Sequence, residues 1–353
     1  MSKMLEEIRQ QPAALERTLR GAERSVMELR RRLVVRRPRL IVLAARGTSD
    51  NAAQFGRYLL EITTGIPVSL AAPSIFTLYH AELDLTNALV VGISQSGEST
   101  DTNFVLERAR DLGAVTVGIT NNAGSTLAGL PEHLFLVRAG KERSVAATKT
   151  YTGQLLMLYL LAQALGAPLR PDDLRRLPAW AEAALRLEPE IRERAERYRF
   201  LRQTVVVGRA LNYSNAFEFA LKLMETCYVV AERFSSADFL HGPIAMVAPS
   251  FPVFLFTPRG VTWPSLKQML EKLAALEAET LVFTDRGNLQ AIALCRRAIT
   301  IPARLAPRPP FPEDLYTPIP YIIPAQLLAA SLAAEKGLDP DRPRTLTKVT
   351  QTL

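Results

Sequence analysis

The sequence predicts an α/β fold built from two copies of one unit. Each copy is a doubly wound parallel sheet flanked by helices, in a flavodoxin-like three-layer α/β/α arrangement. Three observations predict it. Short apolar runs typical of buried parallel strands alternate with amphipathic segments along the 353 residues. A turn of small hydroxyl-bearing residues follows one of those runs, and segments of the first half recur in the second half at a constant spacing.

Composition narrows the class of protein. With 48% apolar and 22% charged residues, the chain is globular and long enough for two domains. The net charge is +8, but the basic residues are spread among acids. This favours an Arg-rich surface that attracts anionic substrates, with no nucleic acid as partner. We find neither a signal peptide nor an apolar run of 18 residues, so we expect a cytoplasmic protein without a membrane segment.

Cysteine and histidine usage gives no sign of a cofactor. Cys227 and Cys295 lie in apolar, helix-like surroundings, so we expect free buried thiols in a reducing compartment. The three histidines lie far apart without paired spacing. We therefore expect neither a metal site nor an organic cofactor.

Periodicity predicts the elements of the first half in order. Residues 1–34 form one or two amphipathic helices that are interrupted near Pro12. Buried strands are predicted at 39–45, 68–70, 88–93, 114–120 and 133–137. Helical segments are predicted up to Thr64, at 73–79, after the 94–100 turn up to Gly113, at 125–130 and at 150–165. A polar helical connector at 171–198 then leads into the second half.

The turn Ser94–Thr100 carries the clearest chemical signal. A strand, a small-residue turn and a helix start direct unpaired backbone N–H groups and a partial positive charge at one point, which suits a phosphate. The hydroxyls of Ser94, Ser96 and Ser99 add neutral donors, and Gly97 allows close approach to the backbone. A plain strand-to-helix turn rich in small residues is the alternative interpretation.

Nucleotide motifs are not complete here. The spacing from Gly92 to Ser99 is that of a Walker A loop, but Glu98 stands where the lysine is required, and a carboxylate would repel a triphosphate. The dinucleotide fingerprint is absent as well. A single phosphate on a small molecule is therefore the favoured ligand.

The second half repeats the first at a spacing of 164 residues. Asn51 matches Asn215 and Phe55 matches Phe219 at that spacing, and so do the strands predicted at 88–93 and 252–257. The last helices, 154–166 and 326–338, align only at 172, which places an insertion in Pro307–Pro324. The second copy has no serine cluster at Thr257–Thr262, so we expect one phosphate site per chain.

Candidate acid–base groups lie in the second half. Glu218, Lys222 and Glu225 share one face of the helix predicted at 217–228, after a strand at 204–208. By spacing alone, a surface ion pair with a bystander glutamate is the favoured interpretation. His241 precedes Gly242-Pro243 in a loop, which is compatible with a structural or a proton-transferring histidine. The proline-containing tail carries Leu346 and Val349, so we expect it to dock.

Six motifs, in this order, resemble the SIS (sugar isomerase) family, which includes the isomerase half of glucosamine-6-phosphate synthase and the glucosamine-6-phosphate deaminases. The resemblance runs from about residue 35 to the end of the chain. It implies SIS domains at 35–168 and 199–338 and an active-site tail at 339–353, and with the periodicity above we expect a helical segment at 1–34 and a helical connector at 169–198. The motifs are Gly47–Ser49, Ser94–Ser99, Val145–Lys149, Ala220–Glu225, His241–Pro243 and Arg344–Lys348.

The resemblance also implies roles for individual residues. Glu225 matches the base that moves a proton between C1 and C2 of an open-chain sugar, and Lys222 matches the lysine beside it. His241 matches a ring-opening histidine that reaches the neighbouring subunit's site, which implies a homodimer. Lys348 matches the tail lysine that meets the substrate carbonyl. The implied phosphate contacts are Ser94, Gln95, Ser96 and Ser99, and the implied sugar contacts are Gly47, Thr48, Ser49, Val145 and Ala147.

The chain departs from the synthase pattern at three site positions. Ser99 replaces a threonine, Ala147 replaces a serine and so lacks a donor, and Arg46 replaces a cysteine with a bulky cation. No glutaminase domain precedes residue 35 and no cysteine follows Met1, so synthesis from glutamine is not expected of this chain alone.

The resulting expectation is a phosphosugar aldose–ketose enzyme, a deaminase that converts glucosamine 6-phosphate to fructose 6-phosphate and ammonia. Two alternatives stay open. One is an isomerase or deglycase for another amino- or glycated-sugar phosphate, such as a fructosamine-6-phosphate deglycase. The other is a non-catalytic phosphosugar sensor, against which the joint presence of Glu225, His241 and Lys348 argues.

Overall fold

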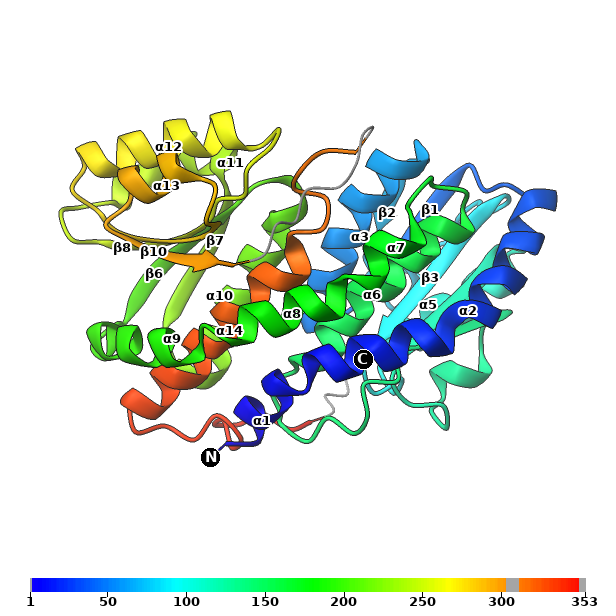
Figure 1. Cartoon of the computed structure of the whole chain (residues 1–353). Coiled ribbons are helices and arrows are strands. Elements are labelled where there is room, and N and C mark those ends of the chain that lie inside the picture. Colours follow the sequence, from blue (N-terminus) through cyan, green and yellow to red (C-terminus); the bar gives the residue numbers. More distant parts are fainter. Residues whose placement is uncertain (1, 303–310, 349–353) are drawn as a thin grey trace. The chain divides into compact units, whose positions relative to one another are not determined.

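The computed structural model of the chain describes residues 2–302 and 311–348. It contains two parallel five-stranded sheets (Figure 1). The first has the order β2-β1-β3-β4-β5, and the second has the order β7-β6-β8-β9-β10 when read from its β7 edge. The predicted duplication is therefore confirmed. The strands are β1 (Leu40–Ala45), β2 (Val68–Leu70), β3 (Ala88–Ser94), β4 (Val115–Thr120), β5 (His133–Leu136), β6 (Gln203–Gly208), β7 (Val230–Ser235), β8 (Pro252–Phe256), β9 (Glu279–Asp285) and β10 (Arg297–Ile301).

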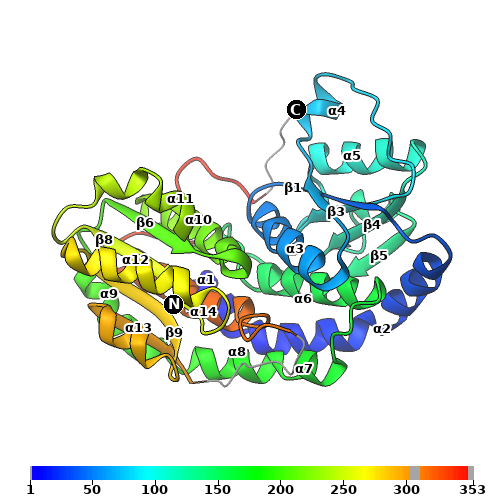
Figure 2. The ribbon, with the colours of Figure 1, turned by 90° about the horizontal axis from the view of Figure 1, so that it is seen from above.

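Helices cover both faces of the first sheet. Val42 and Ala44 of β1 pack in a cluster with Val105 and Leu106 of α5 (Thr100–Asp111). The opposite face carries α3 (Thr48–Thr64) and α6 (Lys149–Ala164), and Figure 2 shows α5 on one side of the strands with α3 and α6 on the other. Successive side chains of a strand point to opposite faces of the sheet and so pack into two apolar layers, as a doubly wound fold requires.

The second sheet has the equivalent helices at equivalent places in the chain. Its elements are α10 (Tyr213–Cys227), α11 (Ser236–Leu240), α12 (Trp263–Ala275), α13 (Leu289–Leu294) and α14 (Pro318–Glu335). The remaining α-helices are α1 (Lys3–Arg9), α2 (Gln11–Val35), α4 (Ser74–Thr77), α7 (Pro171–Arg175), α8 (Leu177–Leu185) and α9 (Glu188–Ala195). Of all the described helices, none is long and apolar enough to span a bilayer.

Three element boundaries differ from expectation or refine it. The break near Pro12 is confirmed, since α2 begins at Gln11 and has that proline in its first turn. The short helix expected at 125–130 is a single 3₁₀ turn, Leu127–Gly129. The last helix starts at Pro318, earlier than the predicted 326. A proline in the first turn lacks only an N–H that has no helical partner, and Pro324 is accommodated inside the helix. Part of the stretch assigned to an insertion is therefore helical.

The chain folds into two compact units, and each unit is composed of segments that are not continuous in the sequence. The first-sheet unit contains Gln10–Arg143, Ala147–Arg176 and the tail from Thr345. The second-sheet unit contains the N-terminal helix α1, Ser144–Ala146 and Leu177–Arg344. Each unit is described by itself below.

Candidate functional site

The strand order of the first sheet creates a topological switch point. The chain runs from β1 outward to β2 and then returns, so that β3 pairs with the other side of β1. Ala45 of β1 and Ile93 of β3 form the last residue pair between these two strands, and Ser94 ends β3. Open α/β sheets bind ligands in the crevice at such a point, beyond the carboxyl ends of the strands. The predicted contacts Gly47–Ser49 and Ser94–Ser99 follow these two strand ends.

The Ser94–Ser99 turn is organised by its own hydroxyls. Ser94 Oγ accepts a hydrogen bond from the Gly97 N–H at 3.0 Å, and Ser96 Oγ accepts one from the Glu98 N–H at 3.2 Å. Since each hydroxyl oxygen acts here as an acceptor, its own proton is available to a ligand oxygen. Ser99 is the N-cap of α5, so the positive end of that helix dipole faces the same turn.

Gly97 and Glu98 both stabilise the conformation of this turn, Gly97 through its backbone and Glu98 through its side chain. Gly97 has φ +75°, and a Cβ at this position would overlap the Ser125 side chain, so glycine is required. The Glu98 carboxylate accepts hydrogen bonds from the backbone N–H of Thr126 at 3.1 Å and from its hydroxyl at 2.7 Å. The glutamate at the Walker-lysine position is thus bonded to the loop after β4.

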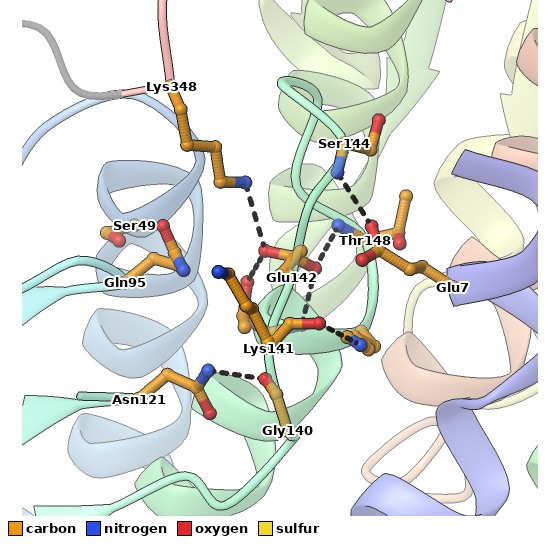
Figure 3. A network of polar contacts seen from close by, with 12 residues as sticks. Glu7, Ser49, Gln95, Asn121, Gly140, Lys141, Glu142, Ser144, Thr148 and Lys348 are labelled. Carbon is orange, nitrogen blue, oxygen red and sulfur yellow. Dashed lines mark hydrogen bonds and ion pairs between the residues drawn. The ribbon is translucent and has the colours of Figure 1, made fainter. Parts of the chain in front are cut away.

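Residues at the end of β1 complete this part of the site. Ser49 is buried, and its Oγ accepts a hydrogen bond at 2.9 Å from Gln154 Nε2 of α6. Gly47 is the N-cap of α3 and has φ +56°. The Gln95 carbonyl accepts from the Asn121 N–H at 3.3 Å, which ties the serine turn to the end of β4. Figure 3 draws Ser49 and Gln95 with the tail lysine described next.

The tail lysine is held by a buried carboxylate (Figure 3). Lys348 Nζ lies 3.6 Å from Glu142 Oε2, and the Glu142 side chain is fully buried. Glu142 also accepts hydrogen bonds from the backbone N–H groups of Thr148 at 2.9 Å and Thr150 at 3.1 Å. It therefore caps α6, whose own N-cap residue supplies no side-chain cap. The carboxylate both closes the helix start and positions the Lys348 amine.

The predicted sugar-contacting loop is divided between the two units. Val145 belongs to the second-sheet unit, in which Glu7 Oε2 accepts a hydrogen bond at 3.1 Å from the Ser144 N–H. Ala147 belongs to the first-sheet unit. The backbone of this loop is anchored on both sides of the Val145–Ala147 pair.

The acid–base cluster of α10 is buried. Lys222 Nζ lies 2.7 Å from Glu225 Oε2 and 3.4 Å from Glu218 Oε1. The side chains of Lys222 and Glu218 are fully buried, whereas that of Glu225 is 22% exposed. The surface ion pair favoured by spacing alone is therefore wrong. Two carboxylates thus lie beside the buried ammonium of Lys222 and offset its charge, and Glu225 is the member of the cluster that reaches solvent.

His241 and the end of the tail differ in how they are held. His241 is exposed and ends α11, with its backbone N–H donating to the Asp238 carbonyl at 3.1 Å. The Arg344 guanidinium stacks on the Tyr228 ring at 4.5 Å. Leu346 is 41% exposed, so this apolar side chain is not buried, and the described part of the tail makes contacts through Arg344 and Lys348. Val349 lies outside the described residues.

Both sheets of this chain match one family of known proteins. The SIS domain family model matches residues 35–164 and 201–336, which include both sheets. The chain belongs to the SIS domain family. The two matched segments correspond to the two sheets, so both α/β copies are SIS domains.

The curated SIS relatives that match are longer proteins. The glutamine–fructose-6-phosphate aminotransferase [isomerizing] of Pyrococcus horikoshii is 35% identical over 351 residues, which are 98% of this chain and 57% of that protein. The enzyme of the same name from Methanothermobacter thermautotrophicus is also 35% identical over 351 residues, with 98% and 56% covered. The chain therefore spans little more than half the length of these relatives.

Solved SIS structures match over nearly the whole chain. The C-terminal domain of glucosamine-fructose-6-phosphate aminotransferase from Francisella tularensis has a TM-score of 0.86 and 28% identity, covering 97% of this chain and 98% of its own. A putative phosphosugar isomerase from Silicibacter pomeroyi has a TM-score of 0.84 and 32% identity, covering 97% and 100%. Glucosamine-6-phosphate deaminase from Thermotoga maritima, at 21% identity and TM-score 0.76 over 99% and 100%, shares the fold.

Sequence reasoning missed Glu142, the carboxylate beside the SIS tail lysine. It lies six residues before the Thr148 N-cap of α6, outside every quoted motif. The only available signal was an isolated glutamate in a Lys-Glu-Arg run, which is also typical of a solvated loop. Among the residues that the structure describes, no group of three His, Cys, Asp or Glu side chains could hold a metal ion.

Proposed function

We propose that this SIS protein interconverts the aldose and ketose forms of a hexose 6-phosphate, and that its reaction is the conversion of glucosamine 6-phosphate to fructose 6-phosphate and ammonia. The observation that carries the proposal is the buried Lys222, held between Glu218 and the part-exposed Glu225. A fixed carboxylate open to solvent beside a cation suits proton transfer next to a carbonyl. Relatives 35% identical are named for fructose 6-phosphate and for isomerisation, which supports the substrate class.

The first SIS domain binds the phosphate in this proposal. Ser94, Ser96 and Ser99 donate their hydroxyl protons to phosphate oxygens, and the N-terminus of α5 adds its partial positive charge. Gln95 adds an amide donor. The sugar hydroxyls contact Thr48 and Ser49 at the end of β1, with Gly47, Val145 and Ala147 as the further contacts.

The second SIS domain supplies the proton transfer. After His241 helps to open the ring, the Glu225 carboxylate removes the C2 proton of the open-chain amino aldose. The electron pair forms the C1–C2 double bond, and the C1 carbonyl oxygen takes up a proton from water to give an enolamine. Glu225 then returns the proton to C1 and the nitrogen gives up a proton to water, which leaves the imine of fructose 6-phosphate at C2. Water adds to C2, the C–N bond breaks and ammonia leaves. Lys222 orients the carboxylate throughout.

Lys348 acts at the carbonyl carbon in this scheme. Its amine, held by Glu142 at 3.6 Å, either polarises the C2 group or forms an imine with it by expelling the oxygen or nitrogen already bound there. Sodium borohydride reduction of a substrate-loaded sample distinguishes these two roles, because it traps only the covalent imine.

Release of ammonia from glucosamine 6-phosphate, measured without glutamine, tests the proposal directly. Glu225→Gln preserves the side-chain volume and should reduce the rate by about 10²- to 10⁴-fold, the usual contribution of a general base. Glu271→Gln is the matched control, since its carboxylate is 51% exposed on α12 and pairs with Lys267. Equal rates for the Glu225→Gln variant and the unmodified chain would exclude the assignment.

Other outcomes identify the alternative functions. A thermal-shift screen of sugar phosphates, followed by turnover of the best ligand, would reveal an isomerase or deglycase for a different phosphosugar. Tight binding of sugar phosphates with no turnover would favour the sensor.

Mixing two inactive variants tests the proposed homodimer. If His241 serves the neighbouring subunit's site, a heterodimer of His241→Ala and Glu225→Gln chains contains one intact site. Random reassortment of an equal mixture should then restore about a quarter of the unmodified activity. No recovery from reassorted chains would contradict a shared site.

A further inference from the structure

Arg46 lies where the synthase pattern has a cysteine, at the end of β1. It follows Ala45, the residue paired with Ile93, so it leaves the sheet beside Ser94. Its Nε and Nη2 atoms both donate to Asp101 Oδ2, at 3.0 and 2.8 Å. Asp101 is the second residue of α5, the helix that starts from the serine turn. The Arg46 side chain thus extends from one strand end of the switch point to the helix start at the other.

Asp101 creates an electrostatic conflict at this place. Its side chain is only 5% exposed, and it brings a negative charge into the first turn of α5. A carboxylate there is favourable for the helix dipole, but it opposes the binding of a phosphate dianion at the same helix end. The serine hydroxyls and backbone N–H groups of the turn are neutral donors and cannot cancel that charge. Arg46 supplies the compensating cation.

The guanidinium retains hydrogen-bonding capacity after it has bound Asp101. Both hydrogen bonds to Asp101 use the Nε–Nη2 edge and end on one carboxylate oxygen. Within residues 2–302 and 311–348, Arg46 Nη1 makes no hydrogen bond, and the side chain is 48% exposed. Because a guanidinium is planar and rigid, fixing one edge orients the other.

We propose that Arg46 is a specificity-determining residue of the phosphate turn, which donates from its outward edge to the substrate phosphate and neutralises Asp101, and that Asp101 is its positioning residue. This rests on the proposed function, because it assumes that the Ser94–Ser99 turn binds the sugar phosphate. It makes the site select a dianionic phosphate ester over an unphosphorylated sugar more strongly than hydroxyl donors alone would.

The test is calorimetric binding of fructose 6-phosphate, with fructose as the unphosphorylated probe. Arg46→Gln should raise the Kd for fructose 6-phosphate about 10- to 100-fold, because a charge-assisted hydrogen bond to the phosphate is lost and the positive charge beside Asp101 is removed. The Kd of the Arg46→Lys variant should lie between those of the unmodified chain and Arg46→Gln, since lysine keeps the charge but loses the two-bond geometry. The double variant Arg46→Gln/Asp101→Asn should recover part of the loss, because the opposing negative charge is removed too.

Arg259→Gln is the matched control. Arg259 occupies the corresponding switch point of the second SIS domain, pairs with Asp285 at 2.9 Å and is 39% exposed. It should leave the Kd unchanged. Thermal melting of each variant checks that it is folded.

The proposal is overturned if folded Arg46→Gln binds fructose 6-phosphate as tightly as the unmodified chain, or if the unmodified chain binds no sugar phosphate. It is also overturned if Arg259→Gln weakens binding equally. The readout is binding, so it separates this proposal from the proposed reaction. Arg46-dependent binding in a chain that releases no ammonia would leave the phosphate contact standing and reject the deaminase.

Discussion

The two SIS domains have the same strand order but different chemistry at their switch points. In the first, small hydroxyl side chains and a helix N-terminus surround the ends of β1 and β3. In the second, polar groups of the chain bond to one another at the corresponding strand ends. The Thr257 carbonyl accepts hydrogen bonds from Thr284 Oγ1 at 2.6 Å and Asn288 Nδ2 at 3.1 Å, and Arg259 pairs with Asp285. The two copies therefore share the sheet and differ in the residues at the strand ends.

The equivalent helices α3 and α10 show the same divergence. Glu61 and Glu225 are 164 residues apart and occupy matching helix positions. Glu61 Oε1 accepts a hydrogen bond from the Val68 N–H at 2.9 Å and so fastens β2. Glu225 instead pairs with Lys222, where the first domain has Tyr58. A single lysine thus distinguishes a structural glutamate from a candidate base.

The largest expected effect is on stability, at that lysine. Lys222→Met removes the cation between Glu218 and Glu225 and leaves buried negative charge uncompensated, so unfolding free energy should fall by about 3–5 kcal/mol. Urea denaturation measures this loss of unfolding free energy.

Lys149→Met is the comparison in the first domain. Lys149 is also buried, but it donates to the neutral Gln10 side chain and Lys141 carbonyl, so its loss should cost about 1–3 kcal/mol. A smaller loss for Lys222→Met than for Lys149→Met would contradict the reasoning.

Gly97→Ala should separate ligand binding from stability. The added methyl group would overlap the Ser125 side chain at a backbone φ of +75°, so the serine turn must shift. We expect at least about a tenfold weaker fructose 6-phosphate affinity, equivalent to about 1.4 kcal/mol. Gly65→Ala has a similar φ of +69° but an open environment. It should lower the melting temperature through backbone strain alone and leave calorimetric affinity unchanged.

A smaller effect concerns Glu279, whose counterpart in the first domain is Val115. Hydrogen bonds from Arg197 hold the pKa of Glu279 below its ordinary value, although burial opposes this, and Arg297 adds to the effect. A lowered folded-state pKa stabilises the fold above the ordinary glutamate pKa, and this contribution disappears as the pH falls through the folded-state value. Because both arginines are about half exposed, Glu279→Gln should cost no more than about 1 kcal/mol at pH 7.

Urea titrations at pH 7 and pH 3 measure the Glu279 effect. The difference between Glu279→Gln and the unmodified chain should shrink at the lower pH. Glu182→Gln, at an exposed position of α8, should stay within about 0.5 kcal/mol at both. A difference that grows on acidification would refute the assignment.

The smallest effect is on thiol reactivity, and both cysteines of the chain lie in the second domain. Burial raises the pKa of both Cys227 and Cys295 to about 11. Labelling with a thiol-specific disulfide reagent should therefore be slow at pH 7 and should accelerate as the pH rises towards that value, with the less buried Cys295 reacting first. Rapid labelling of both at pH 7 would show that they are accessible thiolates.

The sequence by itself determined the alternation of strands and helices, the duplication and the serine turn. These depend on local periodicity and turn chemistry, so a stretch such as Ala88–Ser94 shows its buried strand in its own residues. Spacing placed Glu218, Lys222 and Glu225 on one helix face, but it could not show whether that face is covered, since burial depends on α14 and the sheet that pack on α10.

Only the tertiary structure decided which distant charges meet. The Lys348–Glu142 pair joins residues on either side of the whole second domain, and Arg46 meets Asp101 from a different strand end. The residues next to Glu142 or Asp101 in the sequence do not indicate its partner. The geometry of the folded backbone and the loss of water around the two charges determine which residues form an ion pair. The sheets therefore follow from short-range pattern, and the arrangement of charge at the candidate site follows from long-range packing.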